Sequence, residues 1–152
     1  MRAASFFGIL ALFLSAHVLA DEGLLIRLHT GVGVLDGGSY QHAGLRVLFD
    51  ASTKKKYGLE LTRVNTKQGD YLAAGIVLEK IESGWFNMSI GTIGYFGMDS
   101  TTSNIPGLVA NLGWEPETVS AFKPFITLRN EILFGAKTRA GTALSAGVAM
   151  KF

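Results

Sequence analysis

The sequence predicts an all-β fold in which eight antiparallel strands close into an up-and-down transmembrane barrel. Three observations predict it. Apolar and polar residues alternate with a period of two through most of the chain, which is the period of strands. The chain has 19 glycines, only 3 prolines and no cysteine, so turns are plentiful and disulfides are excluded. The final segment "ALSAGVAMKF" (143–152) alternates up to Phe152, which predicts a strand rather than a loose tail.

The first twenty residues predict a secretory signal peptide. Arg2 precedes the apolar run "FFGILALFL", and "VLA" at 18–20 supplies small residues for cleavage. The apolar run is too short to span a bilayer as a helix. We therefore expect residues 1–20 to be cleaved and residues 21–152 to form one barrel domain. The alternative is a segment that remains as a membrane anchor.

Eight alternating segments follow, divided by turn residues. They are 23–35, 39–50, 56–65, 71–82, 85–97, 107–115, 122–135 and 142–152. An even number of strands of about ten residues, joined by tight turns, is typical of bacterial outer-membrane barrels.

Two turns predict the register of their hairpins. Folding at "DGGS" (36–39) predicts the pairs Leu35–Tyr40, Gly33–His42, Gly31–Gly44, His29–Arg46 and Arg27–Leu48. Folding at "TKQG" (66–69) predicts the pairs Leu61–Ala74, Leu59–Ile76, Glu60–Gly75 and Lys56–Glu79. Both hairpins separate an apolar face from a charged face, and a slip of one residue would mix the two faces.

Glycine indicates which face lies inside. The charged face carries Gly31, Gly33, Gly44, Gly58, Gly75, Gly91, Gly113 and Gly147, whereas the apolar strand positions carry only Gly94. An eight-stranded barrel is barely wide enough for its own side chains, so long charged residues fit inside only beside small ones. We therefore expect the charged face inside and the apolar face against lipid.

The aromatic residues agree with a membrane barrel because they gather at the strand ends. One predicted belt comprises Phe49, Tyr57, Phe86, Trp114, Phe122 and Phe152, and the other comprises Tyr40, Tyr71, Tyr95, Phe96 and Phe134. The alternative is a scatter of aromatics through a soluble core.

The inward face predicts a network of paired charges. Its members are Arg27, Arg46, Lys56, Glu60, Glu79, Arg129, Glu131 and Lys151. Buried charges need partners, and both signs are present here. A filled, paired interior is a plug, which argues against a wide pore.

The terminal Phe152, with alternating apolar residues before it, resembles the C-terminal signature of bacterial outer-membrane proteins. The chain as a whole resembles the small OmpA- and OmpX-type barrels. That resemblance implies the outer membrane of a Gram-negative bacterium, periplasmic termini and outward loops near 36–39, 66–69, 98–106 and 136–141. It also implies recognition of Phe152, as the assembly signal, by the barrel assembly machinery.

The expected partners are outer-membrane lipid and lipopolysaccharide, and the expected state is a monomer. Binding of nucleic acid is not expected, because the charges nearly balance. The chain has 14 basic residues, one of them in the predicted signal peptide, and 12 acidic residues. The segments 98–106 and 115–124 are the long connections and the candidate contact regions. Asn130 falls on the lipid face, where a bulge could turn it or a neighbouring strand could bind it.

The sequence contains residues that could take part in catalysis, but it matches no known catalytic motif. Lipid A deacylases use a His and a Ser in an "HxSN"-like stretch, which this chain lacks, and outer-membrane palmitoyltransferases resemble it only in strand number. A nucleophile could be assembled from Ser89, with His29 or His42 and the acid Glu60, but the favoured interpretation is that these are satisfied interior polar groups. No spacing predicts a metal site, and no cofactor is predicted.

The leading hypothesis is therefore a structural or interaction barrel of the outer membrane without catalysis. The alternatives are a lipid A-modifying enzyme and a narrow channel for small solutes.

Overall fold

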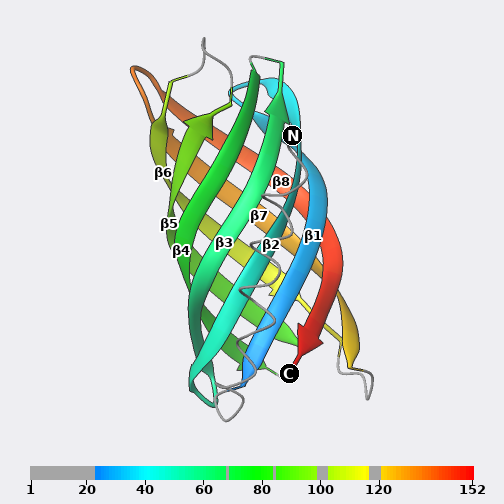
Figure 1. The fold of residues 1–152 in the computed structure, drawn as a ribbon. Helices are drawn as coiled ribbons and strands as arrows, with labels where there is room; N and C mark the ends of the chain where they lie inside the picture. The colour runs from blue at the N-terminus through cyan, green and yellow to red at the C-terminus, as the bar shows by residue number, and fades with distance from the viewer. Residues whose placement is uncertain (1–22, 68, 84, 99–102, 117–120) are drawn as a thin grey trace, which may run out of the picture.

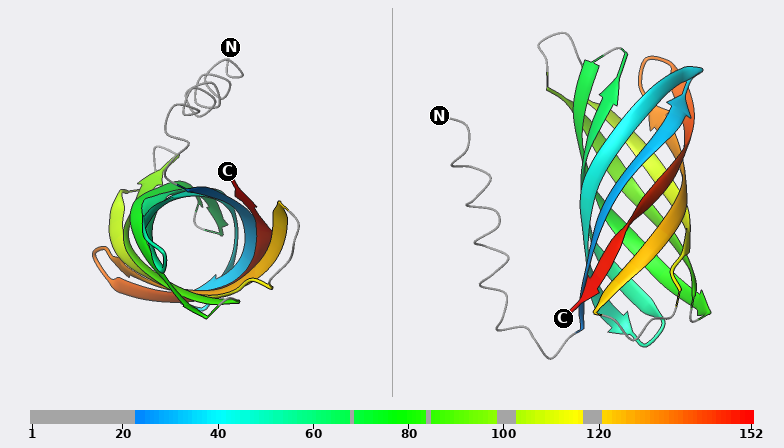
Figure 2. Two further views of the ribbon diagram at one scale, coloured as in Figure 1. Left: turned by 90° about the horizontal axis from the view of Figure 1, so that it is seen from below. Right: turned by 90° about the vertical axis from the view of Figure 1, so that its right-hand side faces the viewer.

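The computed structural model describes residues 23–67, 69–83, 85–98, 103–116 and 121–152. Eight strands close into a barrel in chain order (Figures 1 and 2). They are β1 (Leu24–Leu35), β2 (Gly38–Ser52), β3 (Lys55–Thr66), β4 (Gly69–Ser83), β5 (Phe86–Gly97), β6 (Ile105–Trp114), β7 (Phe122–Phe134) and β8 (Thr138–Lys151). Each strand is antiparallel to its neighbours, and β8 closes the sheet against β1. The predicted fold is confirmed.

The barrel has two distinct ends. Backbone hydrogen bonds join Leu24 to Phe152, from Phe152 N to Leu24 O at 2.9 Å and from Leu24 N to Phe152 O at 3.3 Å. We call this the termini end, and the opposite end, which carries the β1–β2, β3–β4, β5–β6 and β7–β8 connections, the far end. The predicted signal peptide lies outside the described residues. Within the described part of the chain, no helix is long and apolar enough to cross a membrane.

The predicted β1–β2 register is wrong by two residues. The turn contains only Asp36 and Gly37, which have φ values of 49° and 79°. Positive φ at both positions is the requirement of a two-residue hairpin turn whose twist matches the strands. The shorter turn places Arg27 opposite Arg46 rather than Leu48. Because a shift of two preserves the strand period, every side chain keeps its predicted face.

The β3–β4 register is confirmed at every predicted pair, including Lys56 opposite Glu79. Strand bounds differ most at the far end. β8 begins at Thr138 rather than 142, and β6 begins at Ile105 rather than 107. The predicted outward loop at 136–141 is therefore mostly strand, and residues 99–102 of the predicted loop 98–106 lie outside the described part.

The two faces of the sheet are as predicted. Outward Val32, Ile90 and Leu144 are 61%, 62% and 58% exposed, whereas inward Glu60 is 2% exposed. Inward glycines allow the strands to approach their neighbours. A Cβ at Gly58 would lie 1.8 Å from the carbonyl oxygen of Val47, so no other residue fits without moving the backbone.

One predicted aromatic belt is partly wrong. Tyr40, Tyr71 and Tyr95 point into the barrel and are 3%, 8% and 2% exposed, while Phe96 and Phe134 point outward as expected. The tyrosines form the centre of an inner apolar layer at the far end, with neighbours such as Val64, Ile93 and Leu133. We call it the tyrosine layer. A second inner layer at the termini end consists of Leu25, Leu48, Phe125 and Ala149.

Candidate functional site

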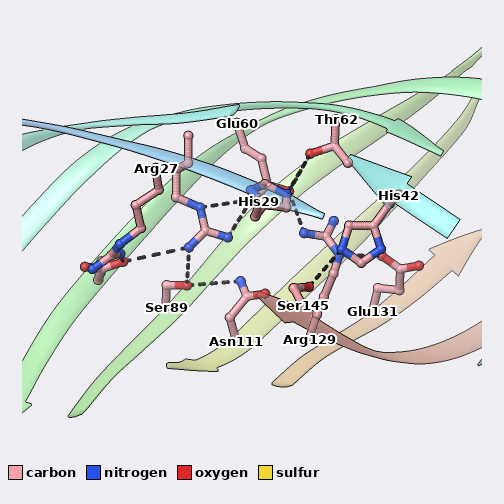
Figure 3. A network of polar contacts seen from close by, with 12 residues as sticks. Arg27, His29, His42, Glu60, Thr62, Ser89, Asn111, Arg129, Glu131 and Ser145 are labelled. Atoms are coloured by element: carbon pink, nitrogen blue, oxygen red, sulfur yellow. Dashed lines mark hydrogen bonds and ion pairs between the residues drawn. The ribbon is translucent and has the colours of Figure 1, made fainter. Parts of the chain in front are cut away.

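A network of buried charged side chains lies inside the barrel (Figure 3). Glu60, on β3, lies at its centre. Its Oε2 accepts hydrogen bonds from Arg46 Nη2 at 2.6 Å and Arg46 Nε at 3.1 Å, and its Oε1 accepts one from Arg129 Nη1 at 2.5 Å. One carboxylate thus joins strands β2, β3 and β7 across the interior.

Arg27 extends the network toward the termini end. Its Nη1 donates to Glu79, and its Nη2 donates to Glu115 Oε2 at 2.7 Å. The Phe125 ring lies 5.5 Å from the Arg27 guanidinium carbon, a cation–π distance. Sequence reasoning missed Glu115 because it lies just after β6, in the segment expected to be a turn. The structure folds this residue back so that its side chain reaches into the barrel.

Glu131 extends the network toward the far end. Its Oε2 accepts hydrogen bonds from Arg129 Nε at 2.9 Å and from the Tyr95 hydroxyl at 2.5 Å. The charged network and the tyrosine layer are therefore linked by a hydrogen bond between buried groups, which fixes the position of one against the other.

Two of the predicted network residues lie elsewhere. The ammonium of Lys56 forms an ion pair with Asp50 rather than with Glu79, although Lys56 and Glu79 are directly opposite each other in the β3–β4 register. Glu79 instead binds Arg27, which reaches it from β1 across the barrel. Lys151 is inward in register, but it is exposed at the termini end and lies outside the connected network. Both departures have the same cause, since strand pairing fixes Cα neighbours but not how far a long side chain reaches.

The most buried part of the network is balanced in charge. It contains three arginines and three glutamates whose side chains are at most 8% exposed: Arg27, Arg46, Arg129, Glu60, Glu79 and Glu131. Glu115, whose side chain is 15% exposed, adds a fourth glutamate at the termini end. Ions removed from water need such partners to be tolerated. The cavity among these arginines has a volume of about 10 Å³, which is roughly the space of one water molecule. The side chains thus fill the barrel at this level.

The structure does not bring the predicted catalytic candidates together. Ser89 Oγ accepts hydrogen bonds from Arg46 Nη1 at 3.3 Å and Asn111 Nδ2 at 3.0 Å, and neither histidine is among its described partners. Glu60 is occupied by two arginines. The His29 and His42 ring centroids are 5.7 Å apart, and His29 Nε2 lies 3.4 Å from Thr62 Oγ1.

A different serine lies beside His42. The His42 Nε2 atom and the Ser145 Oγ atom are 2.8 Å apart, and both residues are buried. Sequence reasoning missed Ser145, although its place two residues from Gly147 gives it an inward position. A histidine that activates a serine is usually oriented by an acid on its second nitrogen. His42 Nδ1 has no hydrogen-bond partner among the described residues. The pair is therefore an incomplete nucleophile arrangement.

Among the described residues, no group of three or more His, Asp or Glu side chains is placed to bind a metal ion.

The outward polar residue Asn130 is bound by a neighbouring strand. Thr142, its β8 partner, donates a hydrogen bond of 2.9 Å from Oγ1 to Asn130 Oδ1. This is one of the two explanations that the sequence left open. The pair lines a hollow on the outer face together with apolar residues such as Ile90 and Ile132.

Known proteins resemble this chain in fold. No protein-family model matches it, and no curated protein sequence matches it. Neisserial surface protein A superposes with a TM-score of 0.62 at 13% identity, over 86% of this chain and 97% of that one. The N-terminal β-barrel domain of Pseudomonas aeruginosa OprF gives 0.57 at 9% identity, over 84% and 97%. A de novo designed transmembrane β-barrel gives 0.57 at 13% identity, over 84% and 95%. The chain therefore has the fold of the small eight-stranded outer-membrane barrels.

Proposed function

We propose that this protein is an integral outer-membrane barrel with a structural or interaction role, whose closed interior performs no catalysis and conducts no solute. The observation that carries this proposal is the buried set of three arginines and three glutamates, beside which the cavity among the arginines measures about 10 Å³. Eight strands leave no room for a channel once such side chains fill the interior. The apolar outer face and the outward aromatic rims support a place in a bilayer.

Conductance tests the plug. The purified chain in planar lipid bilayers should show no steady ion conductance. The matched variant Glu60→Ser with Arg129→Ser removes one charge of each sign and the two side chains that meet at 2.5 Å. We expect this variant to conduct, because the centre of the barrel is emptied without changing its net charge. Steady conductance by the parent protein would overturn the plug and favour the narrow channel.

Location is tested at the C-terminal residue. The Phe152 side chain is 62% exposed, so it contributes little to packing inside the barrel. If the assembly machinery reads this residue, Phe152→Asp should reduce outer-membrane insertion and leave protein in the periplasm. Lys151→Gln, at the exposed neighbouring position, is the control and should insert normally. Insertion of Phe152→Asp at parental levels would argue against the assembly signal.

The second candidate function is a lipid A-modifying enzyme, and the contact between His42 and Ser145 is the observation that favours it. Both residues lie inside the barrel wall, whereas acyl chains lie outside it, so we rank it second. Lipid A from cells carrying the parent protein, Ser145→Ala or His42→Ala should have the same mass distribution. A mass change that requires both residues would establish catalysis and reverse the ranking.

A further inference from the structure

We propose that the outer face of the barrel carries a binding site for one anionic glycerophospholipid. Lys55 and Lys80 hold its phosphate, and an adjoining apolar hollow holds an acyl chain. The proposal rests on the bilayer location proposed above and adds a partner to it. The site lies toward the termini end, outside the barrel wall. In the proposed orientation this end faces the periplasm, so the lipid belongs to the periplasmic leaflet.

The hollow is open and largely apolar. Two hollows of about 770 Å³ and 730 Å³ lie on the outer face, and both are lined by Leu78, Ile90, Ala110 and Asn130, so they are continuous. Leu78 and Ile90 are 57% and 62% exposed, and Ala110 is also exposed. These surfaces are therefore accessible to a guest from the surrounding lipid.

The hollow has the length that an acyl chain needs. Lys80 lines the part near the termini end, and Ile76, four residues earlier on β4, lines the part toward the far end. Four residues of a strand span about 13 Å. The hydrocarbon of one leaflet is about 15 Å deep, half of the bilayer core. An acyl chain whose headgroup lies at Lys80 can therefore follow the hollow within a single leaflet.

Two lysines at one end of the hollow favour an anionic headgroup. Lys55 and Lys80 are directly opposite each other in the β3–β4 register, and both are exposed on the outer face. Like charges at directly opposite positions destabilise a sheet, so an anion between them would relieve the repulsion. Tyr57 lines the same hollow and is 45% exposed, which is typical of a tyrosine at the membrane interface.

Both ammonium groups remain available to a lipid. Lys55 has no ion-pair partner among the described residues. Lys80 lies 2.7 Å from Glu82, but these two side chains are 56% and 40% exposed. An exposed pair of this kind contributes little stability, and an ammonium group has three donors. Lys80 can therefore donate to a phosphate as well.

Two other charged residues border the hollow, but their charged groups have partners elsewhere. Lys56 and Glu79 are buried, and they form ion pairs with Asp50 and Arg27. The exposed charges at the hollow are thus two lysines and Glu82, which leaves an excess of positive charge. This excess favours an anionic lipid over a zwitterionic one.

Native mass spectrometry of the full chain, released from detergent micelles, tests the site by the lipid that the protein retains. The probes are dioleoyl phosphatidylglycerol, which is anionic, and dioleoyl phosphatidylcholine, which has the same chains but no net charge. We expect one phosphatidylglycerol to be retained, with an affinity about tenfold above that of phosphatidylcholine, because two lysines lie at the headgroup. The soluble probe glycerol phosphate, which lacks the chains, should not displace it.

The lysines are tested by two double variants with the same change in net charge. Lys55→Gln with Lys80→Gln should reduce the affinity for phosphatidylglycerol to that for phosphatidylcholine. Lys54→Gln with Lys137→Gln is the matched control, because neither residue lines the hollow and both are exposed. It should leave the preference unchanged.

The hollow is tested by two substitutions of exposed outward alanines. Ala110→Leu places a larger apolar side chain in the hollow and should weaken the binding of both lipids several-fold. Ala146→Leu is the matched control, because Ala146 is an outward residue of β8 that does not line the hollow. It should not alter binding, and circular dichroism should show an intact barrel for both variants.

Four results would overturn the proposal: equal affinities for the two lipids, an equal loss in the two lysine variants, unchanged binding by Ala110→Leu, or a dimer in place of the lipid adduct. The last would mean that a second copy of the chain covers the hollow. A chain that inserts into lipid vesicles without any of the expected preference would lose this site but keep the proposed function. Failure to insert into vesicles of either lipid would contradict the proposed function itself.

Discussion

The inner and outer faces of this barrel use the same eight strands but obey different constraints. The inner face holds buried Arg and Glu side chains that pair with each other, but it has little free space. Gly58 has no room even for a Cβ. The outer face has room for large side chains such as Ile90, which is exposed there, and its charged residues, such as Lys80 and Arg63, lie near the strand ends. Substitutions inside the barrel are therefore limited by space and by the need to pair charges, whereas substitutions outside are limited by contact with lipid.

The largest expected effect is overcrowding of the inner face. Gly58→Leu should prevent the barrel from forming, because even its Cβ would overlap the Val47 carbonyl oxygen at 1.8 Å. The folded fraction after refolding into lipid vesicles, followed by circular dichroism, measures this. Gly94→Ala is the outer-face control, where the closest atom is the mobile ring tip of Phe96 at 3.1 Å. It should fold nearly as well as the parent. If Gly58→Leu folds, space is not the inner constraint.

The second expected effect is loss of a buried charge partner. Glu60→Gln leaves Arg46 and Arg129 without their shared anion and should lower the unfolding free energy by about 3–5 kcal/mol. Urea unfolding in vesicles measures the change. The exposed pair of Lys80 and Glu82, 2.7 Å apart, provides the control, and Glu82→Gln should cost about 0–1 kcal/mol. Equal losses in the two variants would contradict the distinction between buried and exposed charge.

The third expected effect is a charge placed against lipid. Ile90→Arg should reduce the unfolding free energy by about 2–4 kcal/mol if residue 90 lies near the bilayer midplane. The same urea titration measures it, and Ile90→Leu should be close to neutral. A harmless Ile90→Arg, together with labelling of Ser89 by a lipid-soluble probe, would mean that the faces are inverted.

The smallest expected effect concerns the polar exception on the outer face. Asn130→Leu removes an amide that bonds Thr142 at 2.9 Å but also removes a polar group from lipid. These contributions oppose each other, so the unfolding free energy should change by less than about 1 kcal/mol. A loss well above this value would show that the outer face depends on this hydrogen bond.

The sequence correctly predicted whether most charged and aliphatic residues lie on the inner or the outer face. Side chains along a strand alternate between the two faces of the sheet whichever strand lies beside it. A different argument failed for Tyr40, Tyr71 and Tyr95, since their position near strand ends predicted that they belong to an outward aromatic belt. Their alternation with neighbouring residues points inward. Whether a side chain points inward is predicted better by its place in the alternation of the strand than by its distance from the strand end. The interior of a barrel continues to its ends, so a residue near a strand end can still point inward.

The strand number, the closed antiparallel order, the two faces and the β3–β4 register could all be predicted from the sequence. The remaining features depend on contacts that form only in the folded barrel. The β1–β2 register depended on whether Asp36 and Gly37 both take positive φ, which a tight turn requires and spacing alone does not reveal. One partner of Arg27 is Glu79, 52 residues away, and strand pairing does not predict this contact. Only closure of the barrel brings such side chains face to face, because it sets distances across an interior that no strand register describes.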